Sequence, residues 1–271
     1  MKIKSIAIFL ALVLNALISS SALAQYVPPG GLPNNAQAPA NSAVYASQYC
    51  PYFANPSSGA SNVLASVPDN ALLRFGVGNK FSVECFVRVE ADPVTYQYQI
   101  FVWKNGASGI NYGIAQEPTS LYGVPCFSAG AVTATPSATI LPRARWTQLV
   151  AVYDGTNLTL YVDGQVAGTV AATTIDNGAG APLNIGGNNN NNSPGSELGS
   201  LCNVCEVSIW NTNLTQAQIK SHRTAPLKGN ETGLVALYHM NEGSGTTLVD
   251  SGPNGLNGTY SNVFWDERVH Y

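Results

Sequence analysis

Two consecutive β-hairpins are encoded in residues 145–168, and this stretch constrains the fold more than any other part of the chain. An apolar run at 149–153 ends in the turn-forming sequence Asp-Gly-Thr-Asn at 154–157. Apolar and polar residues then alternate from 158 to 162, and the next dipeptide, Asp163-Gly164, favours a type I′ turn. A period of two between tight turns is typical of half-buried strands. The sequence therefore predicts antiparallel β-sheet.

The first 24 residues have the three parts of a secretory signal peptide. Lys2 and Lys4 give a positive start, residues 6–18 form an apolar middle, and Ala22-Leu23-Ala24 is a small-residue cleavage site. A transmembrane anchor is the alternative, but the apolar run is shorter than the roughly 20 residues that span a bilayer. We therefore predict cleavage after Ala24, no membrane span, and a product that is secreted, extracellular or at the cell surface.

The balance of charges argues against nucleic acid as a partner. The chain has 12 Lys and Arg against 15 Asp and Glu, a formal net charge of -3. Loss of Lys2 and Lys4 with the signal peptide makes the product more acidic still. Proteins that bind nucleic acid present a basic patch or stripe. We predict no nucleic-acid partner.

Two further segments follow the signal peptide. Residues 25–44 are rich in Pro, Gly, Asn and Ala without any periodicity, which predicts a disordered tail. Residues 45–271 then fit one domain, because a single β-sandwich can absorb about 200 to 250 residues.

Several phrases in the domain resemble one family in the expected order. They are the opening strand 81–87 (FSVECFV), the hairpins at 145–168, the strand around 182–187 (PLNIGG) and the strand 206–211 (EVSIWN). These phrases are similar to those of laminin-G-like, concanavalin A-like jelly-roll domains. The resemblance implies an all-β, antiparallel jelly-roll β-sandwich.

A short helix is predicted after the last of these strands. Thr215, followed three residues later by Gln218, forms a capping box before Ile219. The helix should therefore run from about 216 to 222. The same order of strand, polar turn and brief helix occurs in the family that the sequence resembles.

The closing segment 230–271 has two possible placements. With Gly229 it contains a second family phrase, GNETGLVALYHMNEGSGTTLVDSGPNGLNGT, which in many laminin-G-like proteins opens a jelly roll. Here it ends the chain, so it either folds back as an edge strand or completes a neighbouring molecule by strand addition. We favour the first, because sequential elements usually lie adjacent. Self-association through this C-terminal strand is the alternative.

Five cysteines in an exported protein suggest two disulfides and one thiol, although their connectivity cannot be deduced from sequence. Cys202-x-x-Cys205 could belong to a redox or zinc site, but no second Cys or His pair has zinc spacing, so we favour a structural role. The resemblance suggests that the strands carrying Cys85 and Cys205 lie near each other in one sheet. On that ground we predict a disulfide between these two residues.

Catalytic patterns of hydrolases are missing. Concanavalin A-like glycosidases carry Glu-x-Asp-x-Glu or Glu-x-Asp-x-x-Glu along one strand, whereas Glu90-Ala91-Asp92 is followed by Val and Thr at 94 and 95. The three histidines come late in the chain, and no Gly-x-Ser-x-Gly elbow occurs. We predict a protein that is not an enzyme, with glycoside hydrolysis as the remaining alternative.

Calcium is the only cofactor that the sequence suggests. The loop 250–258 offers the Asp250 carboxylate and the Asn254 and Asn257 carbonyls, which are hard oxygen ligands. One carboxylate is few for a strong site, and Asp and Asn also stabilise simple turns through bonds to the backbone. We favour the turn and expect weak calcium binding at best. Asp69-Asn70 is a second, weaker candidate.

Glycan recognition would use exposed aromatic rings. We select Tyr96, Tyr98, Tyr112 and Tyr122 as candidates for ligand binding, because they occur in a region that could line one face of the sandwich. The family resemblance, together with secretion and the missing catalytic set, implies a binding or adhesion module. Its partner would be a glycan or a cell-surface protein. The alternative is a structural subunit of an extracellular assembly or a virion.

Overall fold

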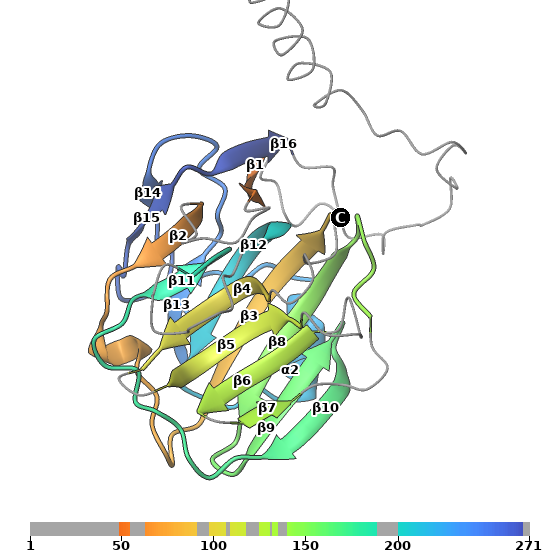
Figure 1. Cartoon of the computed structure of the whole chain (residues 1–271), viewed down its shortest axis with the longest axis vertical. Coiled ribbons are helices and arrows are strands. Elements are labelled where there is room, and N and C mark those ends of the chain that lie inside the picture. Colours follow the sequence, from red (N-terminus) through yellow and green to blue (C-terminus); the bar gives the residue numbers. More distant parts are fainter. Residues whose placement is uncertain are drawn as a thin grey trace, which may run out of the picture. The chain divides into compact units, whose positions relative to one another are not determined.

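The strands lie in two antiparallel sheets of eight strands each, seen in a computed structural model (Figure 1). The structure describes residues 49–54, 63–90, 98–106, 109–117, 125–130, 132–134, 140–188 and 200–267. The predicted signal peptide and tail lie outside these residues. All described residues belong to one compact unit, Asn41–Tyr271.

The first sheet, which we call sheet A, has the strand order β10-β9-β8-β3-β12-β1-β16, and β13 also pairs with β12. Its strands are β1 (Tyr49–Ala54), β3 (Phe81–Val89), β8 (Trp146–Tyr153), β9 (Asn157–Val162), β10 (Gln165–Ala171), β12 (Leu201–Trp210), β13 (Leu234–Tyr238) and β16 (Phe264–Glu267).

The second sheet, sheet B, has the strand order β14-β15-β2-β11-β4-β5-β6-β7. Its strands are β2 (Leu64–Val67), β4 (Gln99–Asn105), β5 (Ile110–Gln116), β6 (Pro125–Gly130), β7 (Val132–Ala134), β11 (Leu183–Ile185), β14 (Thr247–Leu248) and β15 (Gly258–Ser261). A 3-10 turn, η1 (Ala71–Leu73), follows β2.

The two predicted hairpins are confirmed as β8–β9 and β9–β10. In the first turn, the Asp154 carboxylate accepts bonds from the backbone N–H groups of Thr156 and Asn157. In the second, Asp163 and Gly164 both have positive φ, 49° and 74°, as a type I′ turn requires. These local sequences therefore set the turns by themselves.

The main core lies between the sheets and is built from alternate residues of each strand. In β3, for example, Phe81, Val83, Cys85 and Val87 point inward. The Phe81 ring packs against four other aromatic rings, Phe75, Tyr112, Phe127 and Tyr153. Residues at even positions of β3 therefore face outward from sheet A.

Helix α2 (Gln216–His222) covers part of that outer face. It begins at the predicted capping box, in which Thr215 and Gln218 exchange bonds. Ile219 packs into a second cluster with Val150 and Val152 of β8 and with Trp210 of β12. The helix thus covers one half of the outer face of sheet A and leaves the other half, toward the start of β8, without this cover.

The closing segment folds onto its own chain. β13 pairs with β12, β15 pairs with β2, and β16 pairs with β1. All five residues of β13 are buried. Self-association through this segment stays a prediction.

The predicted pairing of Cys85 with Cys205 is wrong. Cys205 forms a disulfide with Cys50, while Cys85, Cys126 and Cys202 are buried free thiols. Cys85 points into the core between the sheets, whereas Cys205 stands opposite the outward-facing Phe86. Because the two thiols project to opposite faces of sheet A, no disulfide can join them.

Candidate functional site

Two of the four tyrosines predicted to bind a ligand, Tyr98 and Tyr112, belong to the described residues, and they lie on opposite faces of sheet B. Tyr112 is wholly buried, and its hydroxyl donates to the carbonyl oxygen of Leu73. It points into the core between the sheets, so its ring is closed to a ligand, which contradicts the predicted role of Tyr112 in ligand binding. Tyr98 is partly buried against a small cluster on the outer face of sheet B. Tyr96 and Tyr122 lie outside the described residues.

The outer face of sheet B is closed at its centre. The Trp103 indole lies over Gly113 of the next strand, where an added Cβ would meet the ring at 2.1 Å. Its Nε1 donates to Asn105 Oδ1 at 2.8 Å, and only 5% of the residue is exposed. The ring is therefore a packing element in this structure and does not present an open platform.

The proposed calcium loop uses its oxygens for backbone bonds. Asp250 Oδ1 accepts from the N–H groups of Leu237 and Gly252, and Oδ2 accepts from Leu256. Asn257 Oδ1 accepts from the N–H of Asp250 itself. These contacts are those of the turn that we considered beside the metal site. Calcium binding here stays a prediction.

The second calcium candidate is an ion-pair centre. Asp69 bonds to Arg74, to Lys104 Nζ at 2.9 Å and to the N–H of Gly180 at 2.7 Å. Burial opposes its charged form, but these bonds lower the pKa of Asp69. Two cations already neutralise this carboxylate.

A buried polar network lies between sheet A and α2. Glu84 accepts from Gln148 at 2.6 Å and from Ser208 at 3.4 Å, and it pairs with His222 Nδ1 at 2.8 Å. The Ser208 hydroxyl therefore contacts the carboxylate, whereas a Ser-His-acid triad needs it on the histidine. His222 also stacks on Trp210, with ring centroids 5.3 Å apart. The arrangement docks α2 and lacks the geometry of an activated nucleophile.

The uncovered half of the outer face of sheet A carries a row of aromatic and polar side chains. The register places these residues directly opposite one another on five neighbouring strands. We call this row the aromatic strip: Trp146 on β8, Arg88 on β3, Asn203 on β12, Tyr52 on β1 and Phe264 on β16. It crosses four inter-strand spacings, or about 19 Å.

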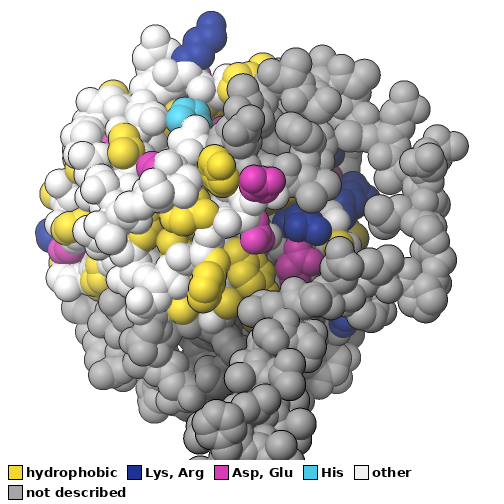
Figure 2. Space-filling model, turned by 90° about the horizontal axis from the view of Figure 1, so that it is seen from above, with side chains coloured by type: hydrophobic (Ala, Val, Ile, Leu, Met, Phe, Trp, Pro, Cys, Tyr) yellow, Lys and Arg dark blue, Asp and Glu magenta, His cyan; other side chains and the backbone are white. Residues whose placement is uncertain are grey.

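The solvent exposure of the strip differs from residue to residue. Phe264 is 61% exposed, while Trp146, Arg88 and Tyr52 are partly exposed. Asn203 is buried between them. On the side of the molecule where β1 and β16 lie, hydrophobic side chains stand next to acidic and basic ones (Figure 2).

One buried oxygen of the strip receives no hydrogen bond from any residue that the structure describes. The Asn203 amide nitrogen donates to the carbonyl oxygen of Pro51 and to Asp266 Oδ2, so the orientation of the amide is set. Its Oδ1 has no hydrogen-bond partner among the residues that the structure describes. Buried acceptors of this kind are rare, and bound water or a ligand usually satisfies them. The strip therefore contains one buried amide oxygen whose hydrogen-bonding capacity is not used by the described residues.

Charges around the strip are mixed. Arg88 pairs with Glu90 at 2.7 Å. Burial, with a smaller contribution from Asp266, raises the pKa of Glu90 although Arg88 opposes the change. Burial, followed by the nearby Cys202, Glu90 and Asp266, raises the pKa of Tyr52. Neutral phenol, guanidinium, amide and carboxylate groups are therefore gathered within one surface.

Sequence reasoning missed this strip for a physical reason. The alternation in β3 does place Arg88 outward, but it does not predict that Trp146 lies opposite Arg88 on β8. Tyr52 and Phe264 come from strands near the two ends of the described chain. Only the pairing of β16 with β1 and of β1 with β12 brings them beside Asn203.

Comparisons with solved structures point to the same fold. A candidate carbohydrate-binding protein from Bacteroides ovatus matches with a TM-score of 0.63 at 15% identity, over 82% of this chain and 60% of that one. This chain thus spans less than two thirds of that protein. A heptameric SAP-like pentraxin from Limulus polyphemus matches with a TM-score of 0.53 at 11% identity, over 81% of this chain and 96% of that one. At these identities the likeness shows the fold alone.

Sequence comparisons identify the family. No curated protein matches the sequence. A family model described as the concanavalin A-like lectin/glucanases superfamily matches residues 58–220, more than half of the chain. Apart from this match, within the part of the chain that the structure describes, no helix is long and apolar enough to cross a membrane. The family match shows that the chain belongs to the concanavalin A-like lectin/glucanase superfamily.

Proposed function

We propose that this protein is an exported, non-catalytic module that binds a glycan through the aromatic strip. The observation that carries the proposal is the row of partly or largely exposed rings, Trp146, Tyr52 and Phe264, on the outer face of sheet A, with the Arg88 guanidinium in the same row. Aromatic rings offer flat, apolar faces to the C–H faces of sugar rings, while guanidinium and amide groups bond to hydroxyls. An extended oligosaccharide suits the length of the strip.

Two observations support export. The sequence features of residues 1–24 are those of a secretory signal, and the Cys50–Cys205 disulfide suits an oxidising compartment. The module would then meet glycans or cell-surface partners outside the cell. The likeness to a candidate carbohydrate-binding protein agrees with this role.

A glycan array, screened with and without calcium, is the first test. We expect binding to a neutral oligosaccharide family, and the calcium arm also tests the loop around Asp250. If the protein binds no glycan on the array and self-assembles on a sizing column, the result would favour a structural subunit instead. Release of reducing sugar from a polysaccharide would contradict the non-catalytic role.

Substitutions locate the binding face. Tyr52→Ala and Trp146→Ala should each weaken the affinity for the array ligand at least tenfold, about 1.4 kcal/mol, because each removes a stacking ring. Tyr98→Ala is the matched control, since it removes a partly exposed ring from sheet B. Thermal melts show whether each variant stays folded. If only the Tyr98 variant loses binding, the binding site lies on sheet B and not on sheet A.

A further inference from the structure

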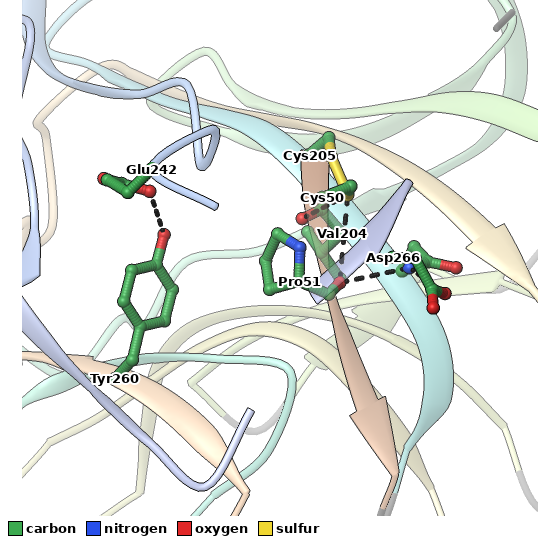
Figure 3. Close-up of a disulfide and its surroundings, with 8 residues drawn as sticks. Cys50, Pro51, Val204, Cys205, Glu242, Tyr260 and Asp266 are labelled. Carbon is green, nitrogen blue, oxygen red and sulfur yellow. Dashed lines mark hydrogen bonds between the residues drawn. A yellow bond between two sulfur atoms is a disulfide. The ribbon is translucent and has the colours of Figure 1, made fainter. Parts of the chain in front are cut away.

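The Cys50–Cys205 disulfide lies beside the aromatic strip. Cys50 stands opposite Asp266 on β16, and the β1–β12 register, continued by two residues, puts Cys50 opposite Cys205. Both sulfurs are on the outer face of sheet A. Cys50 is two residues from Tyr52 along β1, and Cys205 is two residues from Asn203 along β12. Figure 3 shows the bond between them with Pro51, Val204 and Asp266 alongside.

Apart from the disulfide, strand β1 has little backbone pairing with β12. It pairs with β12 only at Tyr52, Phe53 and Ala54. Further along, the edge of β12 is taken by β13, which pairs with it from Val207 onward. Pro51 has no N–H group and gives no ladder bond between Cys50 and Tyr52. The covalent link therefore anchors the end of β1 where backbone pairing is weakest.

The last strand depends on β1 in turn. Among the described strands, β16 pairs with β1 alone. Two of the three rings of the strip, Tyr52 and Phe264, therefore stand on strands that reach the sheet through β1. Trp146 and Arg88 stand on β8 and β3, which pair with each other from Phe81 to Arg88 of β3.

We infer that the Cys50–Cys205 disulfide is a positioning element of the glycan site, holding the Tyr52 and Phe264 half of the aromatic strip in register with the Trp146 and Arg88 half. The inference rests on the proposed function for its ligand. Its structural content concerns β1 and β16, and that part is measurable without any ligand. A general role in holding the domain together would instead affect all strands alike.

Hydrogen exchange tests the structural part in the full-length protein. In the Cys50→Ser/Cys205→Ser variant, amide protection should fall in residues 49–54 and 264–267. Protection in β3 and β8 should stay as in the wild type, because their mutual pairing does not involve β1. Equal loss of protection in all four strands, or no loss in β1 and β16, would overturn the inference.

A double-mutant cycle tests the functional part. The double-serine variant should bind the array oligosaccharide at least tenfold more weakly than the wild type. Tyr52→Ala should then weaken binding in the wild type and change it little in the double-serine background. The reason is that loss of the disulfide weakens binding by displacing Tyr52, so removal of the same ring adds little. If the fold-loss in affinity of the combined variant equals the product of the two separate fold-losses, the disulfide does not act through Tyr52.

Two outcomes separate this inference from the proposed function. If the wild type binds no glycan but exchange rises only in β1 and β16, the proposed function fails and the positioning of those strands stands. If glycan binding is the same with and without the disulfide, the inference fails and the proposed function stands. Should the double-serine variant not fold, the Cys50→Ala/Cys205→Ala variant, which buries no hydroxyl group at these two buried positions, supplies the same comparison, with far-ultraviolet dichroism reporting that the sheets are intact.

Discussion

At the scale of single residues, Glu84 shows how a buried charge can hold a helix on a sheet. Only 1% of the residue is exposed, and its carboxylate is bonded by Gln148, Ser208 and His222. Gln148 also donates to the carbonyl oxygen of Ile219, so one amide joins sheet A to α2. Removal of one partner would leave a buried charge short of bonds, which is costly.

His222 should make stability depend on pH. Burial works against its charged form, but the bond to Glu84 and the charges of Glu84, Glu206 and Glu231 raise the pKa of His222 above its ordinary 6.5. A raised pKa gives stability that is fully present below pH 6.5 and is lost as pH rises through the folded value. We expect the Tm to fall as pH rises from about 6 to 8.

The control for this prediction is His222→Gln. A glutamine amide still donates a hydrogen bond but does not titrate, so the Tm should change less over the same pH range. Circular dichroism melts of both proteins in matched buffers measure the difference. The same slope in both proteins would show that another group is responsible.

Asp250 should be worth more to stability than an ordinary surface carboxylate. Asp250→Ala leaves three backbone N–H groups, those of Leu237, Gly252 and Leu256, without their acceptor. We expect a loss of about 3 kcal/mol, or a Tm lower by roughly 5 to 10 °C. Asp250→Asn keeps one acceptor oxygen and should lose less. An unchanged Tm in the alanine variant would contradict this account.

At the scale of elements, the strands near the ends of the chain complete sheets that the middle begins. β13 and β1 share one edge of β12, each pairing with a different half of it. β15 extends sheet B beyond β2, and β14 pairs with β15. Without these elements the edge of β12 and the edge of β2 would be open.

Deletion of residues 230–271 should therefore prevent stable folding. All five residues of β13 are buried, and its two Leu and one Val side chains contribute roughly 1.5 to 3 kcal/mol each, which together is comparable with the stability of a whole domain. The truncated chain should aggregate through the edge of β12. Size-exclusion chromatography and thermal melts measure this, with a chain ending at Glu267 as control.

Two results would change that view. A truncated protein that stays monomeric with the wild-type Tm would mean that the closing segment does not complete this domain. Full-length protein that forms chains, which the truncation abolishes while the subunits stay folded, would favour strand donation between molecules.

At the scale of the whole molecule, one disulfide and three thiols have separate environments. The disulfide lies on the outer face of sheet A. Cys85 and Cys202 belong to the core between the sheets, and Cys126 packs on the outer face of sheet B. Burial raises the pKa of all three thiols and so disfavours the reactive thiolate.

Alkylation of the native, non-reduced protein should therefore label no cysteine. After denaturation without reductant, mass spectrometry should find label on Cys85, Cys126 and Cys202 only. The expectation follows from their zero exposure and from the disulfide between the other two cysteines. Label on Cys50 or Cys205 would contradict the assigned pairing, and rapid native labelling would show that a core thiol is accessible.

Local sequence determined the features of this protein that depend on neighbouring residues. The alternation from 158 to 162 and the Asp163-Gly164 turn predict β9 and its hairpin, because side-chain direction and positive φ are local properties. Thr215 and Gln218 predict the start of α2 for the same reason. The family phrases added the order of the strands and therefore the sandwich.

The tertiary structure alone decided the disulfide and the aromatic strip. Counted back from the inward-facing Ile209 and Val207, Cys205 should face the core with Cys85, but a bulge at Glu206, with φ of 46°, turns it outward. Its partner then comes from β1, 155 residues away. Tyr52, Asn203 and Phe264 likewise meet only because distant strands become neighbours. Such contacts depend on which strands pair and on where a bulge reverses the faces, and neither is written in a local pattern.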